Sequence, residues 1–186
     1  SHNNALEGEW DYTNYIGRQM NCLTIGIIGY GRLGSMYADY CKSFGSRVIV
    51  YDPYKEIDNL DIKQVNNIDE LLVESDVISI HANLTEETRG MINYSKLKKM
   101  KPNAILLNAS RGEIVVEEDL ELAIKEHIIS GAALDVFEKE PLSSDSPLVN
   151  TKNILLTPHL GASTFEAKEG VSVGICKQIS DFLIEG

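Results

Sequence analysis

The chain has 186 residues, enough for one sizeable domain with its own hydrophobic core. It carries 17 Lys and Arg against 28 Asp and Glu, and this net charge of -11 argues against nucleic acid or an anionic membrane as the main partner, since both require a basic surface. The cysteines, Cys22, Cys41 and Cys176, show no metal or redox spacing, and no apolar run has the length of a membrane span. With no resemblance to a signal peptide in SHNNALEGEWDY, we expect a cytoplasmic protein with reduced cysteines.

Residues 1–21 are expected to form an interdomain linker, because their aromatic side chains follow no clear period. Trp10, Tyr12 and Tyr15 in this segment either join an interface with a second copy of the chain or pack on their own domain. The run CLTIGIIGYG then predicts a buried strand that ends in glycines. A helix follows in RLGSMYADYCKSFG, with Gly45 as its stop and with apolar residues at helical spacing, namely Leu33, Met36, Tyr37 and Tyr40.

The rest of the chain alternates between predicted strands and helices. Strands are expected in RVIVYD, VISI, AILLN, GAALDV and NILLTP, and helices in NIDELLVESD, behind Asn67, and in VEEDLELAIKEH. A long helix is expected over residues 163–186, to about Ile184. This alternation predicts an α/β fold, a doubly wound parallel sheet covered on both faces, over residues 22–162. The glycine motif described next indicates that this is a nucleotide-binding domain of the Rossmann type.

The stretch GYGRLG places Gly29, Gly31 and Gly34 in the G-x-G-x-x-G spacing, between a predicted strand and a predicted helix. In that context Gly29 allows a tight turn, Gly31 lets the backbone approach a pyrophosphate, and Gly34 lets the helix pack closely on the strand. The helix N-terminus would then hold the anion through its N–H groups and its dipole. Arg32 either contacts the pyrophosphate, which we favour, or is solvated at the helix start.

Asp52 ends the second predicted strand, 18 residues after Gly34. A carboxylate at this place hydrogen-bonds the adenosine ribose hydroxyls and repels a 2′-phosphate. The alternative is an aspartate that starts a turn before Pro53. With the glycines in place, the sequence favours NAD over NADP as the cofactor.

Four further polar residues follow the predicted strands, where parallel sheets place their ligands: Arg111, Asp135, Glu140 and His159. Each alone fits an ordinary role in a turn, a strand end, a charged surface or a loop. Together they suit the reduction of a 2-keto acid, because Arg grips a carboxylate with its planar fork and His donates a proton near neutral pH. A neighbouring carboxylate raises the pKa of a histidine and so keeps the proton available.

From about Trp10 to Glu166 the chain resembles the D-isomer-specific 2-hydroxyacid dehydrogenases, through GIIGYGRLG, YDPY, HANLTEETRGMIN, NASRGEIVVEEDL, GAALDVFEKEP and TPHLGAST. The resemblance implies that Arg111 binds the substrate carboxylate and carbonyl, that His159 is the general acid and base, and that Glu140 pairs with it. It further implies that Asp135 holds the nicotinamide carboxamide. The full set of residues expected to contact NAD is Gly29, Gly31, Arg32, Leu33, Gly34, Asp52, Ala82, Asn83, Thr88, Ala109, Ser110, Asp135, His159 and Gly161.

One position departs from the family pattern: Asn83 stands where the family usually has proline, so we expect a less rigid loop there. His81 in the same motif is interpreted as a strand-end or cofactor-neighbour residue. Family members also carry a second, substrate-binding domain, so this chain is expected to bind NAD but to turn over substrate poorly, with residues 163–186 as an interdomain helix. The resemblance further implies a homodimer.

The expected substrate is a small 2-hydroxy or 2-keto acid, with 3-phosphoglycerate as the first choice and hydroxypyruvate or glyoxylate as the second. Two other functions stay open at this point. One is an NAD-sensing interaction protein like the corepressor branch of the family, which keeps the same Arg, Glu and His. The other is an NADP reductase of an unrelated Rossmann family, which Asp52 disfavours.

Overall fold

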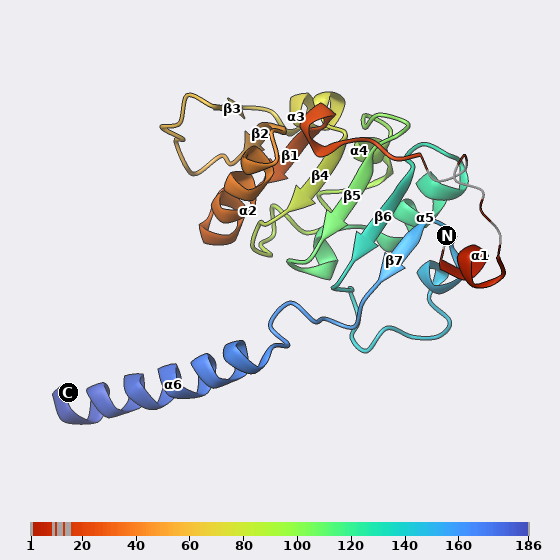
Figure 1. Cartoon of the computed structure of the whole chain (residues 1–186). Coiled ribbons are helices and arrows are strands. Elements are labelled where there is room, and N and C mark those ends of the chain that lie inside the picture. Colours follow the sequence, from red (N-terminus) through yellow and green to blue (C-terminus); the bar gives the residue numbers. More distant parts are fainter. Residues whose placement is uncertain (1, 9, 11–12, 14–15, 186) are drawn as a thin grey trace.

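The computed structural model of the chain describes residues 2–8, 10, 13 and 16–185, so the predicted linker residues Tyr12 and Tyr15 lie outside the described residues. Its centre is a sheet of seven parallel strands in the order β3-β2-β1-β4-β5-β6-β7 (Figure 1). The strands are β1 Thr24–Ile28, β2 Arg47–Tyr51, β3 Ile62–Val65, β4 Val77–Ile80, β5 Ile105–Asn108, β6 Gly131–Leu134 and β7 Ile154–Leu156. In the register of the central strands, Gly26 lies opposite Ile49 on one side and Ile78 on the other. The order confirms the predicted doubly wound sheet.

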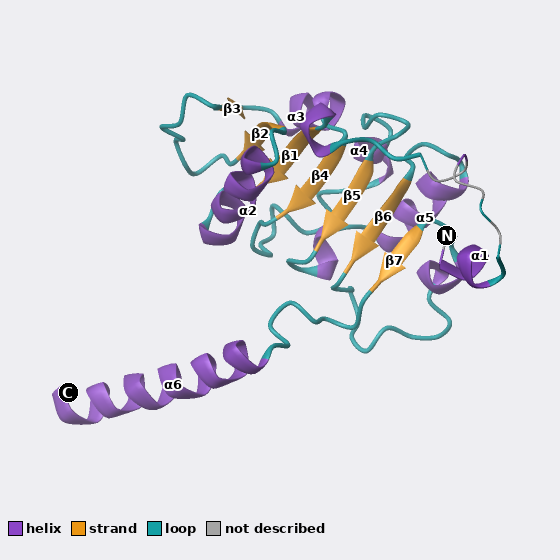
Figure 2. Ribbon diagram, in the orientation of Figure 1, coloured by secondary structure: helices purple, strands orange, loops and turns teal. Residues whose placement is uncertain are grey.

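Helices cover both faces of this sheet (Figure 2). One face packs against α2, Arg32–Ser43, and the other against α3, Ile68–Glu74, α4, Tyr94–Leu97, and α5, Glu117–Lys125. Short 3-10 helices span Met20–Cys22, Gly112–Ile114 and Pro147–Asn150. The predicted start of α3 is confirmed, because the Asn67 side chain accepts a hydrogen bond from the Asp69 N–H at 2.9 Å.

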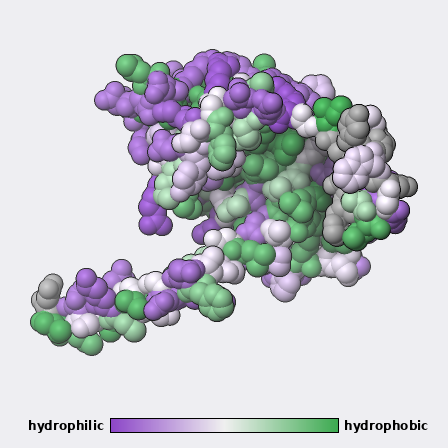
Figure 3. Space-filling view, viewed as in Figure 1, coloured by the Kyte–Doolittle hydropathy of each residue, from purple (hydrophilic) through white to green (hydrophobic). Residues whose placement is uncertain are grey.

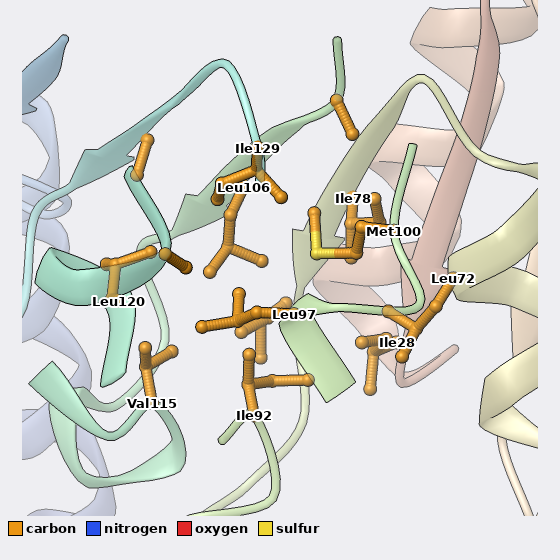
Figure 4. Packing of buried hydrophobic residues seen from close by; sticks show 14 of the residues in the cluster. Ile28, Leu72, Ile78, Ile92, Leu97, Met100, Leu106, Val115, Leu120 and Ile129 are labelled. Atoms are coloured by element: carbon orange, nitrogen blue, oxygen red, sulfur yellow. The ribbon is translucent and has the colours of Figure 1, made fainter. Parts of the chain in front are cut away.

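The hydrophobic core consists of two clusters, one on each face. Alternate residues of a strand belong to different clusters: Ile27 packs on the α2 side and Ile28 on the side of α3, α4 and α5. Figure 4 shows the larger cluster, in which Leu97 from α4 and Leu106 from β5 are both fully buried. The strands therefore carry near-continuous apolar runs because both of their faces are covered.

The inner face of α2 differs from the one that its apolar spacing suggested. Leu33, Met36 and Tyr40 are 61%, 45% and 59% exposed, whereas the buried residues of the helix are the small ones, Gly34, Ala38 and Cys41. The reason is the close approach of α2 to the sheet. A Cβ at Gly34 would lie 2.1 Å from the Gly29 carbonyl oxygen, so only small side chains fit between helix and strand.

Two elements of the domain, one strand and one helix, are absent from the sequence-based prediction. Strand β3 is an edge strand with the sequence IKQV, in which only Ile62 and Val65 are buried. Helix α4 has four residues and starts at the Asn93 cap, whose side chain accepts from the Lys96 N–H. The two polar residues of β3 leave it without an apolar run, and the four residues of α4 span little more than one turn, too few to show a helical period.

The two ends of the described chain differ: the N-terminal segment runs along one end of the sheet, whereas the C-terminal helix extends away from it (Figure 1). Helix α1, His2–Leu6, precedes a segment in which Trp10 is 87% exposed, and Arg18 ties that segment to the domain through a 2.8 Å ion pair with Asp76. Helix α6, Phe165–Glu185, confirms the long C-terminal helix and projects from the body. Four of its exposed apolar residues recur every three or four positions, Val171, Ile175, Ile179 and Phe182, while Phe165, Val173, Leu183 and Ile184 are also exposed; Figure 3 shows apolar side chains along the helix. Among the described helices, none is long and apolar enough to cross a membrane.

Candidate functional site

A cleft of about 530 Å³ opens at the carboxyl ends of β1, β2 and β4. It lies at the point where the strand order reverses, above β1 and its neighbours β2 and β4, which is the usual ligand position in a doubly wound sheet. Eight of the residues predicted to contact the cofactor line this cleft: Gly29, Gly31, Arg32, Leu33, Asp52, Ala82, Asn83 and Thr88. Gly34 is buried beneath them, at the contact between α2 and β1.

The glycine loop has the geometry that a pyrophosphate needs. Gly29 has φ +91°, a conformation that L side chains rarely adopt, and its N–H donates to the Tyr51 carbonyl at 2.9 Å. Gly31 is the N-cap of α2, and a Cβ built on it would meet no atom within 4 Å. The space before the helix N-terminus is therefore open on the cleft side, and its free N–H groups and dipole favour an anion there.

Asp52 is held in a fixed orientation at the edge of the cleft. Its Oδ2 accepts the Tyr30 N–H at 2.8 Å, and its Oδ1 accepts the Tyr54 N–H at 3.0 Å. Each carboxylate oxygen has a further lone pair, so Asp52 retains acceptors for ribose hydroxyls. A phosphate at the same place would meet a negative charge that cannot turn away, which fits NAD and disfavours NADP.

The wall opposite Asp52 is the loop that follows β4. The Thr88 hydroxyl donates to the Asn83 carbonyl at 2.7 Å and accepts the Thr85 N–H at 2.8 Å. These two hydrogen bonds close the loop on itself at the position where Asn83 replaces the usual proline of the family.

The cleft also contains residues that the sequence reasoning did not assign. Tyr54 and Glu87 face each other across it, and the Tyr54 hydroxyl donates to the Glu87 carboxylate. His81, interpreted from the sequence as a strand-end or cofactor-neighbour residue, also lines the cleft, with its Nε2 3.0 Å from the Ser79 hydroxyl and its ring 5.1 Å from that of Tyr37. Burial lowers the pKa of His81, so this ring is a neutral wall of the cleft rather than a charged one. Tyr54 could have been recognised as a cleft residue from its place in YDPY, two residues after Asp52.

A second cluster surrounds His159, just beyond β7. Its Nδ1 lies 2.7 Å from Glu140 Oε2, and Glu140 Oε1 accepts the Phe137 N–H at 3.1 Å. The hydrogen bond from His159, followed by that from Phe137, lowers the pKa of the Glu140 carboxyl. Glu140 is therefore ionised near neutral pH, so it must accept from the Nδ1–H. This leaves the Nε2 of His159 for proton exchange, on a side chain that is 52% exposed.

Asp135 fastens the loop on which His159 sits. Its Oδ1 accepts the Thr157 hydroxyl at 2.5 Å and the Leu160 N–H at 2.8 Å, and its Oδ2 accepts the Gly161 N–H at 2.9 Å. Burial opposes ionisation of Asp135, but these hydrogen bonds outweigh it and lower the pKa of the carboxyl. His159 itself has φ +52°, a backbone conformation that costs energy for a residue with a Cβ. The three contacts to Asp135 hold the backbone there.

Arg111 lies at the end of β5, next to predicted residues Ala109 and Ser110. The buried Asn108 supports this turn, since its side chain accepts the Ser110 N–H at 3.1 Å and donates to the Arg111 carbonyl at 2.9 Å. The exposed guanidinium of Arg111 donates to the Ser110 carbonyl at 2.6 Å, and no ion pair of Arg111 occurs among the described residues. It is thus available for an external carboxylate.

The predicted residues accordingly form three groups along one edge of the sheet. The cleft residues lie at β1, β2 and β4, the Arg111 turn at β5, and Asp135, Glu140, His159 and Gly161 beyond β6 and β7. Neither the Arg111 turn nor the His159 cluster lines the cleft. Within the described part of the chain, no three His, Cys, Asp or Glu side chains are placed to hold a metal ion.

Comparisons with known proteins agree with this geometry. Residues 1–161 match the family of the D-isomer specific 2-hydroxyacid dehydrogenase, NAD binding domain. The chain is 42% identical to the D-3-phosphoglycerate dehydrogenase of Synechocystis sp. over 96% of its length, and 41% identical to the glyoxylate reductase of Thermococcus litoralis over 93%. The crystal structure of the D-lactate dehydrogenase of Aquifex aeolicus, complexed with NAD and lactic acid, superimposes over 99% of the chain with a TM-score of 0.89 and 31% identity.

These relatives are longer than the chain. It covers 32% of the Synechocystis protein, 53% of the Thermococcus protein and 60% of the Aquifex chain. The glycine loop, the fixed Asp52 and the match over residues 1–161 concern the cofactor half of such proteins. The chain belongs to the D-isomer specific 2-hydroxyacid dehydrogenase family, of which it is an NAD-binding domain.

Proposed function

We propose that this chain is the NAD-binding part of an oxidoreductase that interconverts a D-2-hydroxy acid and the corresponding 2-keto acid. The observation that carries the proposal is the 2.7 Å contact between His159 Nδ1 and Glu140 Oε2, which leaves an exposed Nε2 for proton exchange. When bound, NAD supplies the nicotinamide ring that accepts or returns a hydride.

The side chains of this domain would perform the rest of the chemistry. His159 donates a proton to the carbonyl oxygen in reduction and removes it in oxidation, while Glu140 stabilises the imidazolium that forms in between. Arg111 binds the substrate carboxylate and polarises the carbonyl. Asp52 binds the adenosine ribose, and Asp135 offers its remaining lone pair on Oδ2 to the nicotinamide carboxamide.

For the substrate, we propose 3-phosphoglycerate first and glyoxylate or hydroxypyruvate second. Relatives named D-3-phosphoglycerate dehydrogenase are 42%, 41% and 42% identical to the chain, which supports the first choice. The 41% identity to a glyoxylate reductase supports the second. The groups that would distinguish a phosphorylated from a small substrate belong to a second domain, so identity within the NAD-binding domain weighs little between them.

The two ends of the described chain suggest further contacts of the whole protein. The 87% exposed Trp10 favours an interface with a second copy over packing on its own domain, which supports the homodimer that we propose. The apolar stripe of α6 supports its role as an interdomain helix, because such a stripe is stable only when covered.

The decisive experiment is a screen of the full-length protein with NADH against a panel of 2-keto acids. Turnover of 3-phosphohydroxypyruvate supports the first substrate, turnover of glyoxylate or hydroxypyruvate the second, and NADH binding without turnover of any acid would favour a sensing protein instead. His159→Gln should then abolish turnover and leave NAD affinity nearly unchanged. A loss of NAD binding in this variant would contradict the proposed role and make His159 a structural residue.

The 186-residue chain provides a second test. We expect it to bind NAD but to reduce no 2-keto acid at an appreciable rate, because it spans only part of the length of its relatives and a substrate site is complete only once it closes over the substrate. Robust turnover by the chain alone would refute this expectation.

A further inference from the structure

The turn that carries Arg111 and the turn that carries Glu140 are in direct contact. Gly112 is fully enclosed there: a Cβ on it would lie 1.9 Å from the Phe137 carbonyl carbon and 2.5 Å from the Glu138 nitrogen. The contact is thus backbone on backbone, with no side chain that could adjust between them. Any displacement of the 137–140 turn changes the position of Glu140 relative to Arg111.

A third element, the N-terminus of α5, is hydrogen-bonded to the 137–140 turn. Glu117, the first residue of α5, is half-buried, and its Oε1 accepts the Glu138 N–H at 2.8 Å. The adjacent N–H, that of Phe137, donates to Glu140 Oε1 at 3.1 Å. Two successive backbone N–H groups are therefore bound by two carboxylates, one from α5 and one from within the turn itself. Glu117 thus fixes the peptide group of the Glu138 N–H, and the adjacent N–H, that of Phe137, orients Glu140.

Glu117 lies in an unfavourable place for a charge. Burial raises the pKa of its carboxyl, the Glu138 N–H opposes this rise, and the nearby carboxylates of Glu138 and Glu118 add to it. An acid in the first turn of a helix needs no such burial to interact with the helix dipole, and the exposed Glu118 has the same favourable position. The dipole alone therefore does not account for a carboxylate that reaches inward to a loop.

We propose that Glu117 is a positioning residue for the acid–base pair: by accepting the Glu138 N–H, it holds the 137–140 turn in the conformation in which Glu140 meets His159. The inference rests on the proposed function, in which Glu140 and His159 form that pair. Glu117 acts through the turn and contacts neither reacting atoms nor cofactor. Its role requires an acceptor oxygen at the right distance, and a negative charge is not essential to it.

The test is an NMR titration of the 186-residue chain, with two readouts that a purely structural role would leave unchanged. One is the pKa of the Glu140 carboxyl, followed by its carboxyl carbon, which the hydrogen bond from His159 holds below the ordinary value. The other is the signal of the His159 Nδ1–H, because this proton exchanges more slowly with water when it is hydrogen-bonded to Glu140. His159→Gln serves as the reference for a lost pair and assigns both signals.

Four substitutions distinguish the contact from the charge. Glu117→Ala removes the acceptor, and Glu117→Asp withdraws it by one methylene while keeping the charge. Both should raise the pKa of Glu140 toward that of the His159→Gln reference and weaken the Nδ1–H signal. Glu117→Gln retains an acceptor oxygen and should restore both readouts to those of the unmodified chain. Glu118→Ala, the matched control, removes the same charge one residue along and should change neither.

The outcomes separate this inference from the proposed function. If Glu117→Ala and Glu117→Asp leave both readouts unchanged while His159→Gln raises the pKa of Glu140, the inference is wrong and the proposed pair stands. If His159→Gln itself leaves the pKa of Glu140 unchanged, the pair does not form in solution, and both fail. Should Glu117→Ala not fold, Glu117→Asp decides, because aspartate is favourable in the first turn of a helix.

Discussion

The close approach of α2 to β1 predicts different effects on stability for alanine at two glycines of the same loop. In Gly34→Ala the new Cβ would lie 2.1 Å from the Gly29 carbonyl oxygen, well below the 3.4 Å at which ordinary contact begins. The obstacle is backbone that belongs to the loop itself, and a further contact at 3.3 Å to the His81 Cβ blocks a sideways shift. The helix must move outward as a whole.

Overpacking of this kind costs about 1–3 kcal/mol of unfolding free energy. For a chain of this size, each kcal/mol lowers the midpoint of thermal unfolding by about 2–4 °C. Moving α2 also displaces its N-terminus from the pyrophosphate position, so NAD affinity should fall together with stability.

Gly31→Ala is the matched control, because a Cβ on Gly31 meets nothing within 4 Å and the residue has φ -73°. Alanine meets no steric obstacle there, so thermal unfolding should change less than in Gly34→Ala, by no more than the loss of a favourable N-cap residue. The same methyl group occupies the space that the pyrophosphate needs, so we expect at least about a tenfold loss of NAD affinity, which corresponds to 1.4 kcal/mol. Thermal unfolding and calorimetric titration with NAD measure the two effects. A Gly34→Ala variant as stable as the unmodified chain, or a Gly31→Ala variant that binds NAD equally well, would refute the reasoning.

Two further predictions concern carboxylates. Asp52→Asn should weaken NAD binding by about 1.5–3 kcal/mol, because a charge-assisted hydrogen bond is lost, and should reduce the difference in affinity between NAD and NADP. Tighter binding of NADP than of NAD by the unmodified chain in calorimetry would overturn the cofactor assignment. For Asp76, burial opposes ionisation, but hydrogen bonds from Thr24, Arg18 and Lys101 outweigh it and lower the pKa of the carboxyl. Asp76 thus stabilises the fold fully above its ordinary pKa of 3.8, and this contribution is lost as the pH falls through the lowered value. In urea unfolding, Asp76→Asn should be less stable than the unmodified chain at neutral pH, and the difference should shrink in acid; a difference independent of pH would contradict this origin.

The parallel sheet and the edge of it where the predicted residues lie were predictable because both follow from local patterns. Apolar runs that end in glycine or a polar residue identified six of the seven parallel strands, and parallel strands place their carboxyl ends at one edge. That is how Asp52 and Arg111, far apart in the chain, were assigned to one site region. The missed strand, β3, carries polar residues at two of its four positions and so has no apolar run.

The parts that escaped prediction depend on loop conformation and helix distance. The contact of Glu117 with the Glu138 N–H arises from a turn whose shape no residue period encodes. The spacing of Leu33 and Met36 predicts a helix but not its buried face, because the glycine loop brings α2 so close to the sheet that its small residues are the buried ones. The distance between α2 and the sheet determines which face of the helix is buried.

The three hydrogen bonds of Asp135 to the 157–161 loop have a consequence for the order of events in a complete enzyme. They come from this domain alone, so the loop around His159 is formed before any other part of the protein arrives. A preformed half-site loses little conformational entropy when its ligand binds. Cofactor can then dock on a rigid surface, and the ordering cost of catalysis falls on the substrate and the partner domain. Under the proposed function, we expect from this division that NAD binds first and leaves last, visible as a substrate that fails to bind without cofactor.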